Sequence, residues 1–312
     1  MKLSIVTTLY CSEPYIEEFY RRASNAAQQL VGNDYEFVIV DDGSPDNSLH
    51  LAVKLAERDT HVKVLELSRN FGHHKAMMTG LMHAQGELVF LIDSDLEEEP
   101  EWLNQFALRL QDEKCDVVYG VQENRKGNWF EKISGKIFYK LFRILTKIEQ
   151  PDNIVTARLM KLQYVQHLCK YQERELNIGG IFLDAGYKQI TQLVNKGNTS
   201  PTTYNLTKKV HHLVNAIISF SSTPLNLNFY FGLMITIASL VYIIYLIGLY
   251  VLKTPPSGYT SVVASVSFFS GIIIFFQGLQ GIYISKIYNE VKQRPYTILK
   301  KIYWNGHEKY IP

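Results

Sequence analysis

The chain has 312 residues, of which 46% are hydrophobic and 20% are charged, and its formal net charge is +2 at pH 7. This length suits one sizeable soluble domain with a smaller part beside it, and the nearly neutral charge argues against nucleic acid as a partner. The three cysteines are widely spaced and lack a histidine cluster, which argues against a disulfide framework or a zinc site and favours a reducing compartment.

The first 120 residues alternate apolar runs with helical patterns. We predict strands at residues 3–9, 36–40, 62–67, 88–92 and 117–119, and helices at 15–30, 47–58, 75–84 and 100–112. This alternation predicts an α/β fold, a mainly parallel sheet with helices on both faces. Ligands bind such sheets at the carboxyl ends of the strands.

Polar clusters follow four of the predicted strands. They are Tyr10–Glu13, Asp41–Ser44, Ser68–Gly72 and Asp93–Asp95. The last is a D-x-D pair, which suits one hard divalent cation, Mg²⁺ or Mn²⁺, whose shell is completed by water and substrate phosphates. There is no P-loop, G-x-G-x-x-G or G-x-S-x-G motif, so ATPase, dehydrogenase and α/β-hydrolase functions lose their main support.

Two of these clusters suit a nucleoside diphosphate. Asp41 and Asp42 can accept hydrogen bonds from a base and a ribose, although the same residues also suit a helix-capping turn. The Arg69 guanidinium can bind a diphosphate in a fork, although a surface ion pair is an equal alternative. The adjacent His73 and His74 point in different directions and are not predicted to bind metal.

The C-terminal part carries two long apolar runs. Residues 229–252 and 260–284 are each long enough to cross a bilayer, so a two-helix transmembrane hairpin is predicted. The flanks carry Lys208, Lys209 and a further basic group at 286–301, whereas the connecting loop carries only Lys253, so both termini are expected in the cytoplasm. The first apolar run of the chain is too short for a signal peptide.

Residues 129–148 form a basic amphipathic pattern that suits a helix lying at the membrane interface. An ordinary surface helix is the alternative. A second interfacial helix is predicted at 204–220.

Together the motifs resemble those of a known family. Val40–Asp46, Leu67–His73, Asp93–Glu97 and Asp116–Val121 look like the motifs of inverting family 2 glycosyltransferases. The resemblance covers nearly the whole chain and is closest to the polyprenyl-phosphate branch, which is similar to dolichol-phosphate mannose synthase and the bacterial undecaprenyl-phosphate glucosyltransferases. That branch also carries interfacial helices and a C-terminal transmembrane pair.

The resemblance implies a GT-A fold and a role for each matching residue. The nucleotide would be bound by Thr8, Tyr10, Glu13, Asp41, Asp42 and Arg69. Asp93 and Asp95 would be catalytic and hold Mg²⁺ or Mn²⁺, with Asp95 as the preferred direct ligand. From charge placement, the acceptor phosphate would meet Arg158, Lys196, Lys208 and Lys209.

The chain departs from the family pattern at two places. Its first strand ends Thr8-Leu9-Tyr10-Cys11-Ser12-Glu13 instead of Pro-x-Tyr-Asn-Glu, which affects the nucleoside contacts. Thr156 stands where many members carry Asp, and Asp152, Glu173 or Glu175 could replace that carboxylate. Glu175 is taken as the candidate that orients the acceptor or the metal, with a solvated surface charge as the alternative.

The sequence therefore predicts a bacterial inner-membrane enzyme that moves a sugar from a nucleotide-diphosphate donor, preferably a UDP-sugar, to polyprenyl phosphate. The expected parts are a nucleotide-sugar core at 1–125, an acceptor region at 126–228, the hairpin at 229–285 and a cytoplasmic tail at 286–312. Transfer to a sugar hydroxyl of a glycan and a non-catalytic membrane scaffold are the alternatives. The sugar, the base, the pathway and the oligomeric state, a homo-oligomer included, stay open.

Overall fold

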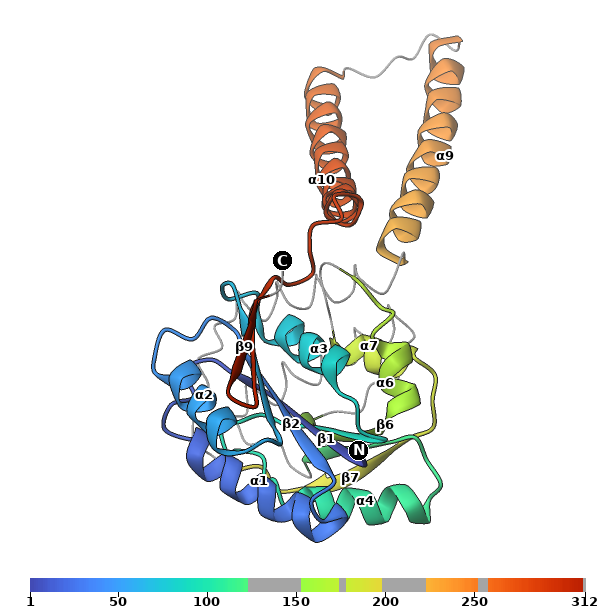
Figure 1. Ribbon diagram of the computed structural model, residues 1–312. Coiled ribbons are helices and arrows are strands. Elements are labelled where there is room, and N and C mark those ends of the chain that lie inside the picture. Colours follow the sequence, from blue (N-terminus) through green and yellow to red (C-terminus); the bar gives the residue numbers. More distant parts are fainter. Residues whose placement is uncertain (123–152, 174–177, 198–222, 252–257, 311–312) are drawn as a thin grey trace. The chain divides into compact units, whose positions relative to one another are not determined.

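The computed structural model in Figure 1 describes residues 1–122, 153–173, 178–197, 223–251 and 258–310. These residues form two compact units. The first contains the described residues up to 197 together with 294–310, and the second contains 223–251 and 258–293. The two predicted interfacial helices lie outside the described residues.

The first unit is built on a nine-stranded sheet with the order β7-β5-β6-β4-β1-β2-β3-β8-β9. Its strands are β1 (Leu3–Leu9), β2 (Tyr35–Asp41), β3 (Val62–Leu67), β4 (Leu88–Leu91), β5 (Val117–Gln122), β6 (Ile154–Lys161), β7 (Gln189–Val194), β8 (Leu299–Trp304) and β9 (His307–Tyr310). The first four strands are parallel to one another, whereas β6 runs antiparallel between β4 and β5. The predicted α/β fold is confirmed, with a sheet that is mixed at its margins.

Helices cover both faces of this sheet (Figure 1). They are α1 (Ile16–Val31), α2 (Ser48–Arg58), α3 (His73–His83), α4 (Trp102–Asp112), α6 (Leu162–Leu168) and α7 (Ile178–Asp184). Helix α1 contacts both α2 and α4 on one side, and α3 contacts α6 on the other.

The central strands β1 and β2 are mainly apolar because helices bury both faces of the sheet there. All seven residues of β1 and of β2 are buried. The main core joins alternate residues of these strands, such as Ile5 and Phe37, to Phe19 on α1. On the opposite face, a Cβ added to Gly80 of α3 would lie 2.5 Å from Val6 Cγ1, so α3 can approach the sheet closely only because this residue is glycine.

The C-terminal strands return to this sheet. Strand β8 pairs antiparallel with β3, Leu65 facing Ile302, and β9 pairs with β8. The buried Glu66 accepts hydrogen bonds from Lys300 and, at 2.7 Å, from the Tyr303 hydroxyl. These strands cover an edge of β3 that would otherwise present unpaired backbone groups.

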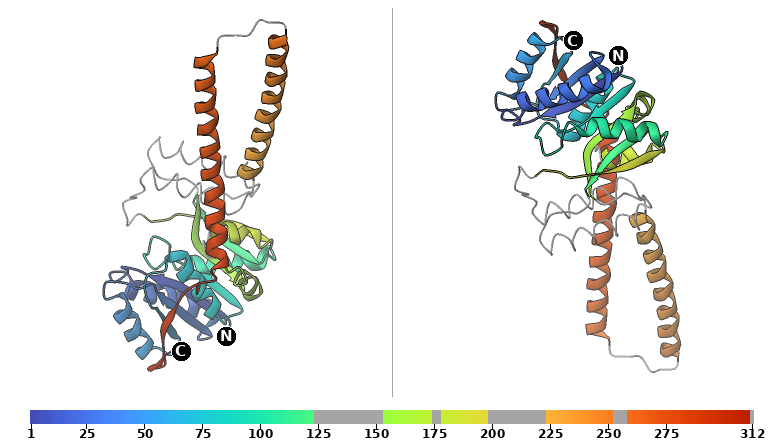
Figure 2. Two further views of the ribbon diagram at one scale, coloured as in Figure 1. Left: turned by 90° about the horizontal axis from the view of Figure 1, so that it is seen from above. Right: turned by 90° about the horizontal axis from the view of Figure 1, so that it is seen from below.

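The second unit consists of helices α9 (Thr223–Val251) and α10 (Tyr259–Val291). Both views of Figure 2 show them as long helices side by side, and the Phe231 and Phe276 rings meet edge to face at 5.7 Å. Within the described part of the chain, one helical segment, Phe268–Val291, is long and apolar enough to cross a membrane. Helix α9 contains no Asp, Glu, Lys or Arg.

Candidate active site

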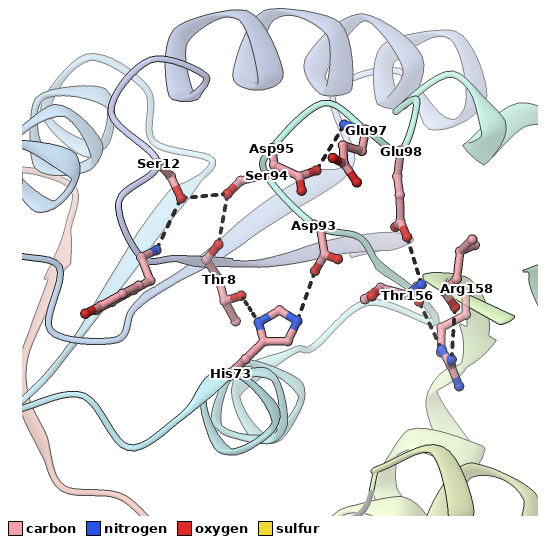
Figure 3. Close-up of polar contacts among 12 residues, drawn as sticks. Thr8, Ser12, His73, Asp93, Ser94, Asp95, Glu97, Glu98, Thr156 and Arg158 are labelled. Carbon is pink, nitrogen blue, oxygen red and sulfur yellow. Dashed lines mark hydrogen bonds and ion pairs between the residues drawn. The ribbon is translucent and has the colours of Figure 1, made fainter. Parts of the chain in front are cut away.

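The candidate site lies where the parallel strands end. Strands β1, β2, β3 and β4 all finish at one edge of the sheet. Strand β6 begins at that edge because it runs antiparallel to β4, with Leu91 facing Arg158. The sheet therefore brings the D-x-D pair beside Thr156, a residue far away in sequence (Figure 3).

Asp93 lies between α3 and β6. Its Oδ1 atom is 3.3 Å from His73 Nε2 but lacks hydrogen-bond geometry with it, while His73 Nδ1 lies 3.1 Å from Thr8 Oγ1. Burial would raise the pKa of Asp93, but the His73 ring and the Thr156 hydroxyl hold it below its ordinary value. Burial would lower the pKa of His73, and Asp93 outweighs that effect and raises it.

Ser94 fixes the middle of the D-x-D loop. Its hydroxyl donates to the Thr8 carbonyl at 3.0 Å and lies 3.2 Å from the Ser12 hydroxyl. The Ser48 hydroxyl at the start of α2 in turn accepts from the Ser12 backbone N–H at 2.9 Å. This buried network joins the loops after β1 and β4. It therefore holds the loop that carries Asp93 and Asp95 in one conformation.

Asp95 turns back on its own loop, where Oδ1 accepts from the Glu97 backbone N–H at 3.0 Å. Burial and the nearby charge of Asp93 raise the pKa of Asp95. Lys196, just beyond β7, lies 3.1 Å from Glu97 Oε2, and the Gly197 N–H donates to the Glu97 carbonyl at 2.8 Å. Lys196 is thus docked on the D-x-D loop.

Glu98 is a site residue that the sequence reasoning missed. It is fully buried, and its Oε1 atom accepts from the Thr156 backbone N–H at 2.8 Å. The run Glu97-Glu98-Glu99 resembles a solvated acidic segment, so its sequence gives no signal that the middle residue points inward. The structure therefore places a carboxyl group at Thr156, the position that lacks the family Asp.

Arg158 is also buried. Its Nε donates to the Thr156 carbonyl at 3.1 Å, and its guanidinium stacks on the Phe182 ring at 3.4 Å. Burial lowers its pKa to about 10, which leaves the group cationic at neutral pH. Arg158 lies beside the D-x-D loop, as its predicted role requires, although only 5% of its surface is exposed.

Asp41 and Asp42, at the end of β2, make different contacts. Both Asp42 oxygens are used, because they accept from the Phe71 and Gly72 N–H groups at 2.7 and 3.0 Å. Asp41 accepts from the Ser44 N–H at 3.3 Å, and its Oδ1 is buried without a hydrogen-bond partner among the described residues. Burial raises the pKa of both carboxyl groups.

The remaining predicted nucleotide residues are arranged around this pair. Arg69 stacks on the Phe71 ring at 4.0 Å and donates to the Asn70 carbonyl at 2.9 Å. Tyr10 is 54% exposed, so its ring is free to stack on a ligand. Both Glu13 oxygens accept hydrogen bonds from Asn47, before α2, so this carboxylate supports the loop.

The two D-x-D carboxylates suit a divalent cation. Asp93 Oδ1 is buried with no hydrogen-bond partner among the described residues, and burial and the charge of Asp93 raise the pKa of Asp95, which a bound cation would lower. Among the residues that the structure describes, no three His, Cys, Asp or Glu side chains converge on one point. Such a cation would therefore need oxygen ligands from water and substrate phosphates, as Mg²⁺ and Mn²⁺ accept.

Three predicted site residues, Glu175, Lys208 and Lys209, lie outside the described residues, as does Asp152. Glu173 is half-buried beyond α6. The roles assigned to all these residues stay predictions.

Comparisons with known proteins show the family to which the chain belongs. A Mycobacterium tuberculosis (strain CDC 1551 / Oshkosh) protein assigned as a glycosyltransferase is 48% identical over 97% of this chain and 89% of its own length. The undecaprenyl-phosphate 4-deoxy-4-formamido-L-arabinose transferase of Enterobacter sp. (strain 638) is 28% identical over 98% of this chain and 94% of its own.

The fold is shared with a solved structure of Mycobacterium tuberculosis glucosyl-3-phosphoglycerate synthase, which holds Mn²⁺, UDP and glucosyl-3-phosphoglycerate. The two chains are 17% identical, and the match covers 72% of this chain and 81% of the synthase chain with a TM-score of 0.51. The model of glycosyl transferase family 2 matches residues 4–169. With more than half of the chain inside that match and a relative at 48% identity along nearly all of it, the protein belongs to glycosyltransferase family 2 and is a glycosyltransferase.

Proposed function

We propose that this protein transfers a sugar, with inversion, from a nucleotide-diphosphate donor to polyprenyl phosphate at the cytoplasmic face of a bacterial inner membrane. The observation that carries the proposal is the meeting of Asp41, Arg69, Asp93 and Asp95 at one edge of the sheet, in a chain that also holds a membrane-length apolar helix. The Enterobacter relative, which acts on undecaprenyl phosphate by its name, supports the acceptor class.

The donor would bind along the ends of β1 to β4. Asp41 and Asp42 are the proposed partners of the base and ribose, and Arg69 is the proposed partner of the diphosphate. A UDP-sugar is the preferred donor. Mg²⁺ or Mn²⁺ on Asp93 and Asp95 would supply positive charge to the leaving diphosphate. The bond from the anomeric carbon to the diphosphate breaks as the acceptor oxygen attacks the opposite face.

A phosphate acceptor explains why the site manages without a carboxylate at residue 156. A phosphate monoester has a second pKa near ~6 and is already a nucleophilic dianion at neutral pH. A sugar hydroxyl needs a general base in contact with it. Glu98, the carboxyl group at Thr156, is fully buried and does not meet that requirement. Lys196 is the half-buried cation proposed for the phosphate, while Arg158, which is 5% exposed, and Lys208 and Lys209 stay predicted contacts.

The topology of the sheet supports two membrane crossings. Because β8 pairs with β3, residues before α9 and after α10 belong to one domain and must lie in one compartment. An even number of crossings must therefore separate β7 from β8. If α10 is one crossing, the uncharged α9 is the second, which makes the two-helix hairpin part of the proposal.

A donor screen tests the proposed reaction. Purified full-length protein in detergent is incubated with radiolabelled nucleotide sugars and polyprenyl phosphate, with Mn²⁺, with Mg²⁺ or with excess EDTA. We expect a labelled lipid with one donor, without a glycan primer, and its loss in EDTA. A product that forms only when a glycan primer is added would favour transfer to a sugar hydroxyl.

Topology is tested with a protease-sensitive tag placed either after Pro312 or within residues 252–257. In inside-out membrane vesicles we expect cleavage of the C-terminal tag and protection of the loop tag. Cleavage of both tags would contradict the hairpin.

A further inference from the structure

Glu98 is the least solvated carboxyl group at the site. None of its surface is exposed, whereas the neighbouring Glu99 is exposed. One of its oxygens, Oε1, accepts from the Thr156 N–H at 2.8 Å, and the other, Oε2, has no hydrogen-bond partner among the described residues. Burying a carboxyl group with one oxygen unsatisfied costs stability, so its retention calls for a role other than folding.

The surroundings of Glu98 indicate that role. Lys196 Nζ lies 3.9 Å from Glu98 Oε1 and 3.1 Å from Glu97 Oε2, so two adjacent side chains of the D-x-D loop hold one ammonium group. Thr156 carries the contact on to Arg158, whose Nε binds the Thr156 carbonyl. Through Lys196 and Thr156, Glu98 therefore links the loop that binds the donor to both cations proposed for the acceptor.

We propose that Glu98 is a positioning residue, which holds Lys196 and the beginning of β6 against the D-x-D loop and thereby sets the place of the acceptor phosphate beside the donor. This inference rests on the proposed function, because it takes Lys196 and Arg158 as acceptor contacts. Glu98 performs at Thr156 a task for which Asp152, Glu173 and Glu175 were the sequence candidates. It acts through its neighbours and does not touch the substrate.

Two replacements separate its contacts. Glu98→Gln keeps an acceptor for the Thr156 N–H but replaces the carboxyl group beside Lys196 with an amide. Glu98→Leu removes both contacts and fills the same buried space. The matched control is Glu99→Gln, which changes the adjacent exposed carboxylate. Each variant is compared with wild type for kcat, for the KM of polyprenyl phosphate, for UDP binding with Mn²⁺, for donor hydrolysis and for Tm.

We expect Glu98→Leu to lower kcat/KM for the lipid acceptor about 100-fold, because a small displacement of bound reactants is this costly. Glu98→Gln should raise mainly the acceptor KM, by about tenfold, because it keeps the hydrogen bond to Thr156 but changes the group beside Lys196. UDP binding and donor hydrolysis should stay within about twofold of wild type in both variants, as should every property of Glu99→Gln. The Tm of Glu98→Leu should equal or exceed that of wild type, because a costly buried carboxyl group is gone.

A purely structural role predicts the reverse, with a lower Tm and an unchanged acceptor KM in the folded fraction. Full transfer by Glu98→Leu, or an equal loss of UDP binding and of transfer, would overturn the proposal. Failure of the proposed function is distinguishable, because wild-type protein would then hydrolyse the donor yet never glycosylate polyprenyl phosphate.

Discussion

Asp93 and Asp95 differ in their surroundings although they stand one residue apart. Asp93 faces His73 and Thr156 and has a lowered pKa, whereas Asp95 accepts a single backbone hydrogen bond and has a raised one. The second carboxylate thus keeps an oxygen and unrelieved negative charge for a cation. Asp95 as the direct metal ligand stays a prediction.

Asp95→Asn should therefore lower kcat at least about 100-fold, the scale of a lost preorganised electrostatic contact in a transition state. It should also weaken Mn²⁺ binding in the presence of UDP, measured by calorimetry. The control is Asp112→Asn, on the exposed end of α4. Cellular function that survives Asp95→Asn would favour the non-catalytic scaffold instead.

Glu98 predicts a pH dependence of stability. Burial and the charge of Asp93 raise its pKa from 4.5 to about 8 in the folded protein. Between these values the folded state holds a proton that the unfolded state has lost, so wild-type stability should fall as the pH rises through this window and level off above it. The raised pKa of His73 also makes stability fall as the pH rises. Wild type and Glu98→Gln both contain His73, so it does not change the difference between them.

Glu98→Gln has no such proton, so its Tm should lack this pH-dependent fall. The Tm of Glu98→Gln minus the Tm of wild type should therefore increase from pH 5 to pH 8.5. Thermal unfolding followed by circular dichroism at several pH values measures the difference. A constant difference would show that Glu98 has an ordinary pKa.

At the scale of elements, the loop after β2 is built against the loop after β3. Gly43 has a φ of +66°, and a Cβ on it would lie 2.6 Å from the Asn70 nitrogen and 2.7 Å from the Arg69 carbonyl carbon. Asp42 binds the same second loop through Phe71 and Gly72. The edge proposed to bind the nucleotide therefore consists of two backbones in direct contact, which a side chain at residue 43 would separate.

Gly43→Ala should accordingly raise the Kd for UDP and lower Tm. Gly32 offers a matched control, because its φ is +64° and nothing lies within 4 Å of an added Cβ. Both substitutions carry a backbone strain of about 1–3 kcal/mol, and only Gly43→Ala adds a steric cost of about 1–3 kcal/mol. Equal losses of stability in urea unfolding would contradict this account.

At the scale of the whole molecule, the C-terminal strands join the last residues to the first domain. Ser68 N–H donates to the Ile298 carbonyl at 2.9 Å, and the Thr79 and Thr297 hydroxyls lie 2.8 Å apart. Trp304 Nε1 donates to the Thr60 carbonyl at 3.0 Å. Lys300 and Lys301, counted as basic residues flanking the membrane, bind Glu66 and Glu308 in this part of the sheet.

Removal of residues 294–312 should therefore uncover the edge of β3 and leave the buried Glu66 unpaired. We expect a lower Tm and concentration-dependent aggregation, measured by thermal unfolding and light scattering, because an exposed edge strand recruits other chains. The control truncation ends at Tyr310 and retains both strands. A shortened protein as stable and monodisperse as wild type would show that these strands are dispensable.

The sequence by itself determined the alternation of β1 to β4 with their helices, since apolar periodicity and turn residues are local properties. It also determined the position of the D-x-D pair at a strand end and the presence of an apolar helix near the C-terminus. Only the tertiary structure decided the places of β6 and β8, because antiparallel pairing between residues far apart depends on the assembled sheet. For the same reason it alone showed that Glu98 lies at Thr156, since the direction of one side chain in an acidic run is set by what packs around it.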